Sequence, residues 1–338
     1  LDEDARKKNL LLLSEAGFKT GLNHMTDMQL IDKVHEWGGR VKEFYTFCGA
    51  LPAPEETGNP FGFKFSLPPR TVLKAANHKA VFLKDKKNQE VPSHNLFKDP
   101  VQVNFPGTGQ MEAYPAGNAL LLSSLYNLHE AETLFQGILR YPHWCQSMNV
   151  IKMLGLVSHD PQNFEGKSYK EVVADKLGVF PRNVKEKVAE KLRIGLDDPA
   201  ITALEWLGFF NSELITIKHG SNLDLTVDLM RRKMMLPPGA RDMTVLFHSL
   251  VAAKKDGKKE IIQSSLSDFG TRENASPDRL TALPAAIAAR FIFEGRIKST
   301  GIQVPVLKMI YEPVLKELEK LGITVKEKWG LPESEKII

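Results

Sequence analysis

Short apolar runs alternate with amphipathic segments at the start of the chain. Leu10–Leu13 form a run of four leucines, and a run this short favours a buried parallel strand over a helix. A turn bearing Gly17 and Gly21 follows, and residues 26–38 then carry apolar side chains at helical spacing until a glycine pair ends the pattern. Residues 1–9, before the strand, are charged and helix-prone. This order of helix, strand and turn predicts the last helix-strand unit of a Rossmann-like domain over residues 1–25.

The rest of the chain shows two kinds of pattern. Residues 40–48 read as a strand, and Asp256-Gly257 between two apolar runs predicts a hairpin. Further strands are expected at 81–84, 89–92, 101–105, 243–251, 259–264 and 302–305.

Helical patterns dominate the middle and the end. Residues 120–218 read as mainly helical, beginning with Leu120–Tyr126 and Ala131–Leu139. Amphipathic helices are expected at 168–177, 184–192, 198–209 and 311–321, an apolar helix with proline in its first turn at 284–294, and a last strand at 323–328.

We therefore predict an α/β (α+β) fold in which a mixed sheet carries a helical insertion. The expected parts are the Rossmann-like end at 1–25, the mixed sheet at 26–118 and 219–310, the insertion at 119–218, and a helix and strand at 311–338 that return to the Rossmann side.

Composition excludes several classes. A net charge of +4, from 45 basic and 41 acidic residues, is too small to predict nucleic-acid binding. Two cysteines, Cys48 and Cys145, make no disulfide framework and favour a cytoplasmic protein. No apolar run reaches the ~20 residues that span a bilayer, and no signal peptide is recognisable. The first residue is leucine, as expected of a processed, trimmed or split gene product.

Familiar catalytic motifs are missing from the sequence. Dinucleotide-binding folds need a Gly-x-Gly-x-x-Gly turn, and the nearest segment, at Gly107, has Glu112 where the third glycine should be. The nine histidines are scattered, so no metal site is predicted. No Gly-x-Ser-x-Gly elbow supports a serine hydrolase.

Three segments nevertheless stand out. The turn from Gly17 to Met25 places N–H groups at a helix start, which suits an anion or a cofactor, with Asn23 as N-cap; a plain capped turn is the alternative. The loop from Cys48 to Ser66 is dense in proline, glycine and aromatic residues and is either a shaped site or a structural loop, with Cys48 a buried inert thiol. Arg140 could fork onto a ligand carboxylate or form a surface salt bridge.

Together these segments resemble the saccharopine dehydrogenase (glutamate-forming) family, also called saccharopine reductase. The resemblance runs in order across nearly all 338 residues and implies that most of an N-terminal Rossmann domain is missing. It rests on Gly21-Leu22-Asn23-His24-Met25, Phe47-Cys48-Gly49-Ala50-Leu51-Pro52-Ala53-Pro54-Glu55, Asn59-Pro60-Phe61-Gly62-Phe63-Lys64-Phe65-Ser66, Gln136-Gly137-Ile138-Leu139-Arg140-Tyr141, Leu283-Pro284-Ala285-Ala286 and Ile310-Tyr311-Glu312-Pro313.

The resemblance implies reductive condensation of an aldehyde with an amino acid, with NADP (or NAD) as hydride carrier and an anionic substrate. Lys19, Ile138, Leu139 and Arg140 would bind substrate, with Arg140 as carboxylate clamp. The implied cofactor contacts are Gly17, Phe18, Thr20, Gly21, Leu22, Asn23, His24, Leu67, Pro68, Pro69 and Arg70. A homodimer is implied, with the nucleotide-binding domain missing or on a separate chain. The Leu10–Ser14 strand would then be an unpaired or self-paired edge.

Departures from the family pattern concern the substrate. Lys19 stands where the family has a substrate-contacting aspartate, and Gly117 stands where it has a substrate-binding arginine. His24 and Lys19 are the candidates for a general acid, because both are titratable and well placed. Two alternatives stay open: a non-catalytic dimerisation or ligand-binding remnant, and a carboxynorspermidine-type dehydrogenase.

Overall fold

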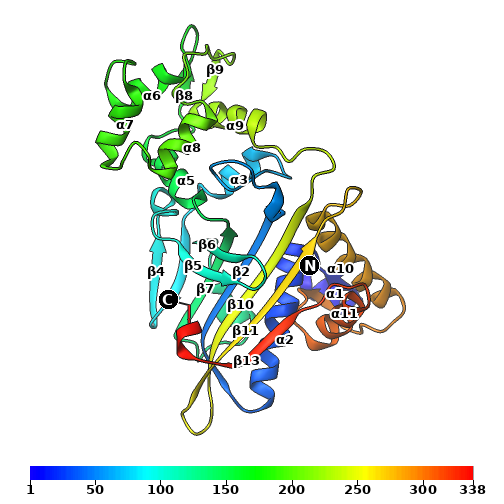
Figure 1. The fold of residues 1–338 in the computed structure, drawn as a ribbon. Helices are drawn as coiled ribbons and strands as arrows, with labels where there is room; N and C mark the ends of the chain where they lie inside the picture. Colours follow the sequence, from blue (N-terminus) through cyan, green and yellow to red (C-terminus); the bar gives the residue numbers. More distant parts are fainter. Residues whose placement is uncertain (338) are drawn as a thin grey trace.

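A computed structural model describes residues 1–337 and shows a large twisted sheet with a helical lobe at one end (Figure 1). The sheet has nine strands in the order β13-β11-β10-β2-β7-β3-β4, and β6 and β5 branch off β7. Its strands are β2 (Arg40–Pro52), β3 (Ala80–Lys84), β4 (Lys87–Val91), β5 (Val101–Phe105), β6 (Gly109–Pro115), β7 (Thr133–Arg140), β10 (Asp242–Ala253), β11 (Lys259–Phe269) and β13 (Lys326–Leu331).

The centre of the sheet combines antiparallel and parallel pairing. β10 pairs antiparallel with both β2 and β11, whereas β2 pairs with β7 in parallel. The predicted hairpin joins β10 to β11, and the N–H of Lys254 donates to the Lys258 carbonyl across it at 2.8 Å. All but the last residue of β10 are buried, because other layers cover this strand. The predicted mixed α/β fold class is confirmed.

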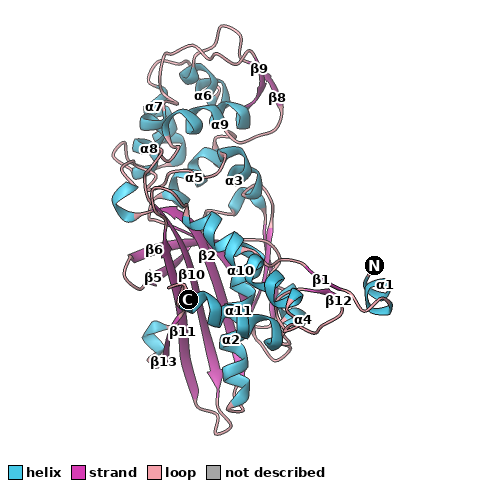
Figure 2. Ribbon diagram, turned by 90° about the vertical axis from the view of Figure 1, so that its right-hand side faces the viewer, coloured by secondary structure: helices cyan, strands magenta, loops and turns pink. Residues whose placement is uncertain are grey.

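Two helices, α2 (Asn23–Glu36) and α10 (Ser276–Phe293), pack against the sheet, and α11 (Lys308–Lys320) packs on both of them (Figure 2). Helix α2 lies on β2 and β10 through a fully buried stripe that includes Leu30, Ile31 and Val34. The prediction for α10 was wrong at its start, because Pro277, not Pro284, lies in the first turn. The apolar run before Pro284 belongs to the same helix.

The lobe consists of five helices and a small antiparallel pair of strands, and most of it lies in the range where the sequence predicted a helical insertion. Its elements are α5 (Trp144–Met153), α6 (Tyr169–Leu177), α7 (Val184–Leu192), α8 (Pro199–Leu207), α9 (Asn222–Lys233), β8 (Pro161–Asn163) and β9 (His219–Ser221). The helical prediction for Ala131–Leu139 was wrong, because this stretch is mostly β7, next to β2 in the large sheet. A strand covered on both faces has no period-2 pattern, so periodicity alone cannot separate it from a buried helix.

The predicted first strand also has a partner. β1 (Leu11–Leu13), which follows α1 (Asp2–Lys7), pairs in parallel with β12 (Gly301–Gln303), so the expectation of an unpaired or self-paired edge was wrong. The last strand was misplaced as well: β13 pairs with β11 in the large sheet instead of returning to the amino-terminal side. Two short helices, α3 (Pro69–Ala75) and α4 (Leu121–Leu125), complete the connections.

Candidate functional site

A cavity of about 450 Å³ lies near the carboxyl-terminal ends of the parallel strands β2 and β7. Its walls come from six parts of the chain: the turn at 17–19, β2 at 48–50, the 63–75 segment, the end of β6, the end of β7 and the first turns of α10. Concave sites with an apolar lining and a few polar groups are the usual form of small-molecule sites.

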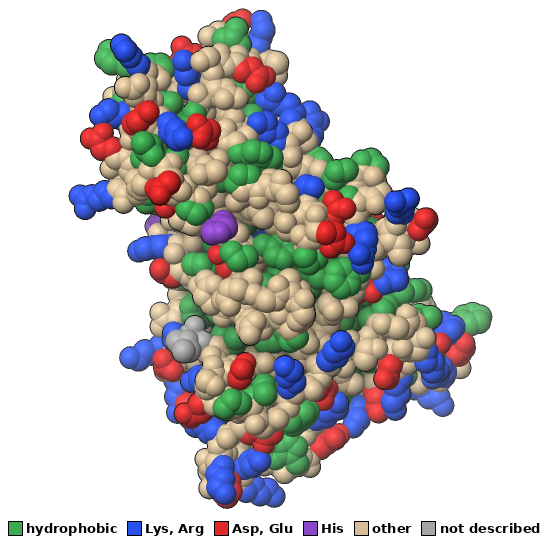
Figure 3. Space-filling view, viewed as in Figure 1, with side chains coloured by type: hydrophobic (Ala, Val, Ile, Leu, Met, Phe, Trp, Pro, Cys, Tyr) green, Lys and Arg blue, Asp and Glu red, His purple; other side chains and the backbone are tan. Residues whose placement is uncertain are grey.

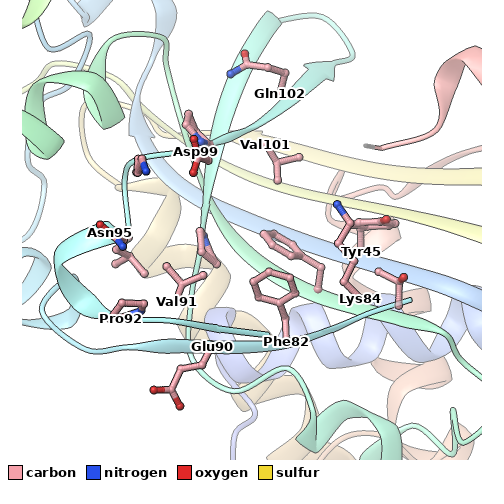
Figure 4. A pocket seen from close by; sticks show the side chains of 16 residues that line it. Tyr45, Phe82, Lys84, Glu90, Val91, Pro92, Asn95, Asp99, Val101 and Gln102 are labelled. Carbon is pink, nitrogen blue, oxygen red and sulfur yellow. The ribbon is translucent and has the colours of Figure 1, made fainter. Parts of the chain in front are cut away.

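A second cavity, of about 710 Å³, lies on the sheet beside β3, β4 and β5 (Figure 4). Tyr45 and Phe82 face its interior, whereas Glu90 points away. None of the residues predicted for the site lines this cavity. The smaller cavity is therefore the candidate site.

The candidate cavity brings together six of the predicted site residues. These are Gly17, Phe18, Lys19, Leu67, Ile138 and Arg140. Leu139, which lies between Ile138 and Arg140 on β7, does not line the cavity. Sequence reasoning missed Tyr114 of β6 and Asp278 of α10, because neither lies near a motif and only the fold brings them to the cavity.

Arg140 is the buried cation of the site, with 5% of its surface exposed. Its guanidinium carbon lies 4.7 Å from the ring centre of Phe63, 5.5 Å from that of Trp144 and 5.7 Å from that of Tyr114. One NH group donates to the Leu139 carbonyl at 2.8 Å, and Nε has no partner among the described residues. The alternative of a surface salt bridge is wrong, because the side chain is buried and no carboxylate of residues 1–337 pairs with it.

The turn before α2 does not form the anion cradle that the sequence suggested. Thr20 has a left-handed backbone, with φ of 70°. The N–H groups of Thr20 and Gly21 both donate to Oδ1 of Asn23, at 2.7 and 3.1 Å. Asn23 therefore closes the turn instead of capping α2, and these two N–H groups are not free to hold a phosphate. A Cβ on Gly21 would lie 2.6 Å from the Glu15 carbonyl, so the turn requires glycine.

The two candidates for a general acid, Lys19 and His24, have different surroundings. Lys19 lines the cavity, is exposed and has no ion-pair partner within the described part of the chain. His24 is buried and does not line the cavity. Its Nδ1 contacts the Tyr126 hydroxyl and its Nε2 lies 3.1 Å from Oε2 of Glu15.

His24 belongs to a buried polar network beneath α2. Asp27 is its centre: Oδ1 lies 2.7 Å from Nδ1 of His248, and the Tyr126 hydroxyl donates to Oδ2 at 2.7 Å. Oγ1 of Thr46 lies 3.0 Å from the same His248 nitrogen. Burial, followed by the Asp27 charge, raises the pKa of Tyr126 well above its usual range, so this phenol stays neutral. The network joins α2 to β2, β10 and the segment before β7.

Cys48 lines the cavity floor and is almost fully buried. Burial raises the pKa of its thiol, against the opposing effect of Lys19 and Arg140. The thiol is therefore protonated near neutral pH, in agreement with the predicted inert role.

The remaining predicted residues lie outside the cavity. Pro68 and Pro69 form the start of α3, and Arg70 forms an ion pair with Asp224 of α9 at a separate open groove. Thr20, Gly21, Leu22 and Asn23 belong to the turn and the start of α2 but do not line the cavity. Gly117, with φ of 66°, has open space where a Cβ would lie and does not line the cavity.

Two general properties complete the picture. Within residues 1–337, no three His, Cys, Asp or Glu side chains are placed to hold a metal ion together. None of the helices that the structure describes is both long and apolar enough to cross a membrane. The fold and the cavity thus define an α/β protein with a candidate small-molecule site that includes a buried arginine.

Comparison with known proteins identifies the family. The saccharopine dehydrogenase C-terminal domain matches residues 17–323. The chain is 32% identical to the glutamate-forming, NADP(+) saccharopine dehydrogenase of Pyricularia oryzae, over 97% of this chain and 76% of that protein. It is 32% identical to the protein of the same name from Saccharomyces cerevisiae, with the same coverage. The chain belongs to the saccharopine dehydrogenase family.

Other comparisons agree with this assignment. The mitochondrial alpha-aminoadipic semialdehyde synthase of Bos taurus is 30% identical over 96% of this chain and 36% of its own length. The structure of apo histidine-tagged saccharopine dehydrogenase (L-Glu forming) from S. cerevisiae matches with a TM-score of 0.87 and 31% identity, over 96% of this chain and 75% of that one. The expectation that most of an N-terminal domain is missing is not borne out, since the chain spans about three quarters of the fungal relatives.

Proposed function

We propose that this protein is an NADP-linked oxidoreductase acting on CH–NH bonds, which joins an aldehyde to an amino acid by reducing the imine they form, or reverses that reaction. Family membership supports the reaction class. The observation that carries the assignment to this cavity is the buried guanidinium of Arg140, whose Nε lacks a partner in the described structure. A buried cation without a counter-ion is costly, and an anionic ligand would offset that cost.

The residues present fit one end of a nicotinamide cofactor. Phe18, Ala50 and Leu67 give the cavity an apolar wall that suits a flat ring. NADPH, when bound, supplies the hydride. No glycine-rich phosphate loop occurs in this sequence, so we propose that a nucleotide-binding domain beyond these residues, or on a separate chain, holds the pyrophosphate.

The protein's own groups would bind and orient the substrate. Arg140 would bind one carboxylate of the substrate. The rings of Phe63, Tyr114 and Trp144 would exclude water from around the guanidinium. Lys19, in the turn before α2, also lines the cavity and would attract a second anionic group. His24 is proposed as a structural group of the buried network and not as the proton donor, because it faces Tyr126 and Glu15.

Several finer points remain proposals. Lys19 and Gly117 favour a substrate related to saccharopine over saccharopine itself, and a carboxynorspermidine-type substrate fits the same chemistry. A homodimer is proposed on the family resemblance, and a cytoplasmic setting is proposed on the presence of only two cysteines in the sequence. A non-catalytic ligand-binding role is the competing function, and it is favoured by the absence of a phosphate loop in this sequence.

The decisive experiment is calorimetric titration of the protein with NADPH, with and without saccharopine, followed by an assay of NADPH oxidation. Turnover with an aldehyde and an amino acid, lost in Arg140→Ala, would establish the oxidoreductase. Substrate binding that depends on Arg140 without any turnover, even after an intact nucleotide-binding domain is supplied, would favour the ligand-binding role.

A further inference from the structure

The larger cavity, beside β3, β4 and β5, lies where the sheet forks (Figure 4). Strand β7 pairs with β2 along one edge, and two strands share its other edge. There β6 pairs with the second half of β7, over residues 137–140, whereas β3 pairs with β7 through the single register pair of Leu83 and Leu134. The hairpins β3–β4 and β5–β6 thus branch from β7 separately, and both supply walls of this cavity of about 710 Å³.

The floor of this cavity is aromatic. Phe135 lies on β7 between the two branches, and its ring centre is 5.1 Å from that of Phe82 and 6.1 Å from that of Tyr45. The rings of Tyr45 and Phe82 face the interior. The Tyr45 hydroxyl donates to Glu43 at 3.2 Å, and Glu43 pairs with Lys336 at 2.7 Å, so the phenol ring is held in place. Rings that are fixed in this way favour a flat aromatic ligand, because little order is lost when it binds.

The rim of the cavity carries an excess of positive charge. Lys84 on β3 and Lys98 in the loop before β5 are exposed, and neither has a carboxylate within 4.0 Å among residues 1–337. Two carboxylates, Glu90 and Asp99, also line the cavity. Glu90 points away from the interior and pairs with Lys79 at 2.7 Å, so its charge is already neutralised. Two lysines against the single carboxylate of Asp99 leave a net charge of +1, which suits a monoanion.

We propose that this cavity is a second ligand-binding site, for a flat aromatic molecule that bears one carboxylate or sulfonate group. The rings of Tyr45, Phe82 and Phe135 contact the aromatic body, and Lys84 and Lys98 attract the anionic group. The volume agrees with this class of ligand, since small-molecule sites occupy roughly 300–1,000 Å³. Different residues line this cavity and the candidate site, so the inference does not rest on the proposed reaction.

The test is calorimetric titration of the protein with naphthoate and with naphthamide, which has the same rings without the charge. We expect one saturable site for naphthoate, from which neither NADPH nor saccharopine displaces it. The double variant Lys84→Gln/Lys98→Gln should weaken naphthoate binding about 2- to 10-fold and naphthamide binding little, because exposed charges contribute modestly. Lys87→Gln is the matched control, since Lys87 is on the same hairpin but does not line the cavity.

A second variant tests the aromatic floor. Phe82→Ala should weaken the binding of both ligands about 10-fold, because each loses a contact with an aromatic ring. Phe180→Ala, at an exposed position of the helical lobe, is the control and should change neither affinity. Thermal unfolding checks that each variant is folded. If Phe82→Ala does not fold, the lysine variants decide the inference.

Four outcomes would overturn the inference. They are the absence of saturable naphthoate binding, an unchanged affinity in the lysine variants, displacement of naphthoate by NADPH or saccharopine, and a loss of binding as the protein concentration rises. The third would place the ligand in the candidate site, and the fourth would show that a second copy of the chain covers the cavity. A protein that binds naphthoate as expected but shows no turnover would support this inference and refute the proposed reaction, so the two can fail separately.

Discussion

Arg140 and Glu112 are register partners across β7 and β6, yet they do not form an ion pair. Glu112 instead accepts the N–H of Cys145 at 2.6 Å, at the start of α5, and burial raises the pKa of this carboxyl. Arg140 lies among three aromatic rings. Because the start of a helix has a positive potential, Glu112 is satisfied without the guanidinium, and Arg140 keeps its charge for a ligand.

Replacing Arg140 should separate binding from stability. In Arg140→Met we expect KM for the anionic substrate to rise and kcat/KM to fall about 10- to 100-fold, because a charged hydrogen bond is lost. The midpoint of unfolding should not fall, because the variant removes a buried cation whose Nε is unpaired. Steady-state kinetics and thermal unfolding measure the two effects. Arg231→Met, on the exposed face of α9, is the control, and an unchanged KM in Arg140→Met would remove Arg140 from the site.

The buried network should contribute strongly to stability. Asp27→Asn is expected to lower the free energy of unfolding by about 3–5 kcal/mol, because it breaks a fully buried pair with His248 and weakens the bond from Tyr126. Urea denaturation measures the loss. A loss of unfolding free energy below 1 kcal/mol would show that the network contributes little to stability. Asp256→Asn, which changes an exposed carboxylate, is the control.

The pair of Arg70 and Asp224 should give the protein a pH-dependent stability. Hydrogen bonds from Arg70 and then Ser221 lower the pKa of Asp224 to about 2, from an ordinary 3.8. A lowered folded-state pKa stabilises the protein above the unfolded-state value, and this contribution is lost as the pH falls from about 4 towards 2. The urea midpoint of wild type should therefore exceed that of Arg70→Met most above pH 4, with the gap narrowing in acid. A gap that is constant with pH would contradict the assignment.

Gly137 should resist even the smallest side chain. A Cβ at this position of β7 would lie 3.0 Å from ring carbons of Phe135 and Phe47 and 3.1 Å from the Tyr114 carbonyl. Gly137→Ala is therefore expected to cost about 1–3 kcal/mol of stability through overpacking. Equilibrium denaturation against Ser267→Ala, at an exposed position of β11, measures the difference, and equal stabilities would show that the rings move aside freely.

Local sequence patterns predicted many elements well. α7 was predicted at 184–192 and is found at those residues, and β5 agrees in the same way at 101–105. In both cases the amphipathic pattern and the flanking turns lie within the segment itself. The main error was the helix predicted at Ala131–Leu139, where the structure has strand β7. This strand is buried on both faces, and the strand that it pairs with, β2, lies about 90 residues earlier in the chain.

The site was predicted in part. Lys19, Ile138 and Arg140, which the family resemblance implied for substrate binding, line one cavity in the structure, and each lies in or beside a recognisable motif. Asp278 was missed, since no pattern around it indicates a site. His24 was given a catalytic role because it lies beside the turn, but helix α2 directs its ring towards Tyr126.

The sequence by itself determined the family, the mixed α/β class and most helices and strands, because these depend on ordered motifs and on periodicities within single segments. Only the tertiary structure decided which charged groups share a cavity, which N–H groups are already satisfied, and which carboxylates have other partners. Hydrogen bonds and ion pairs act over a few ångströms in space, and residues such as Arg140 and Asp278 come within one cavity only when β7 has joined the large sheet and α10 has packed against it.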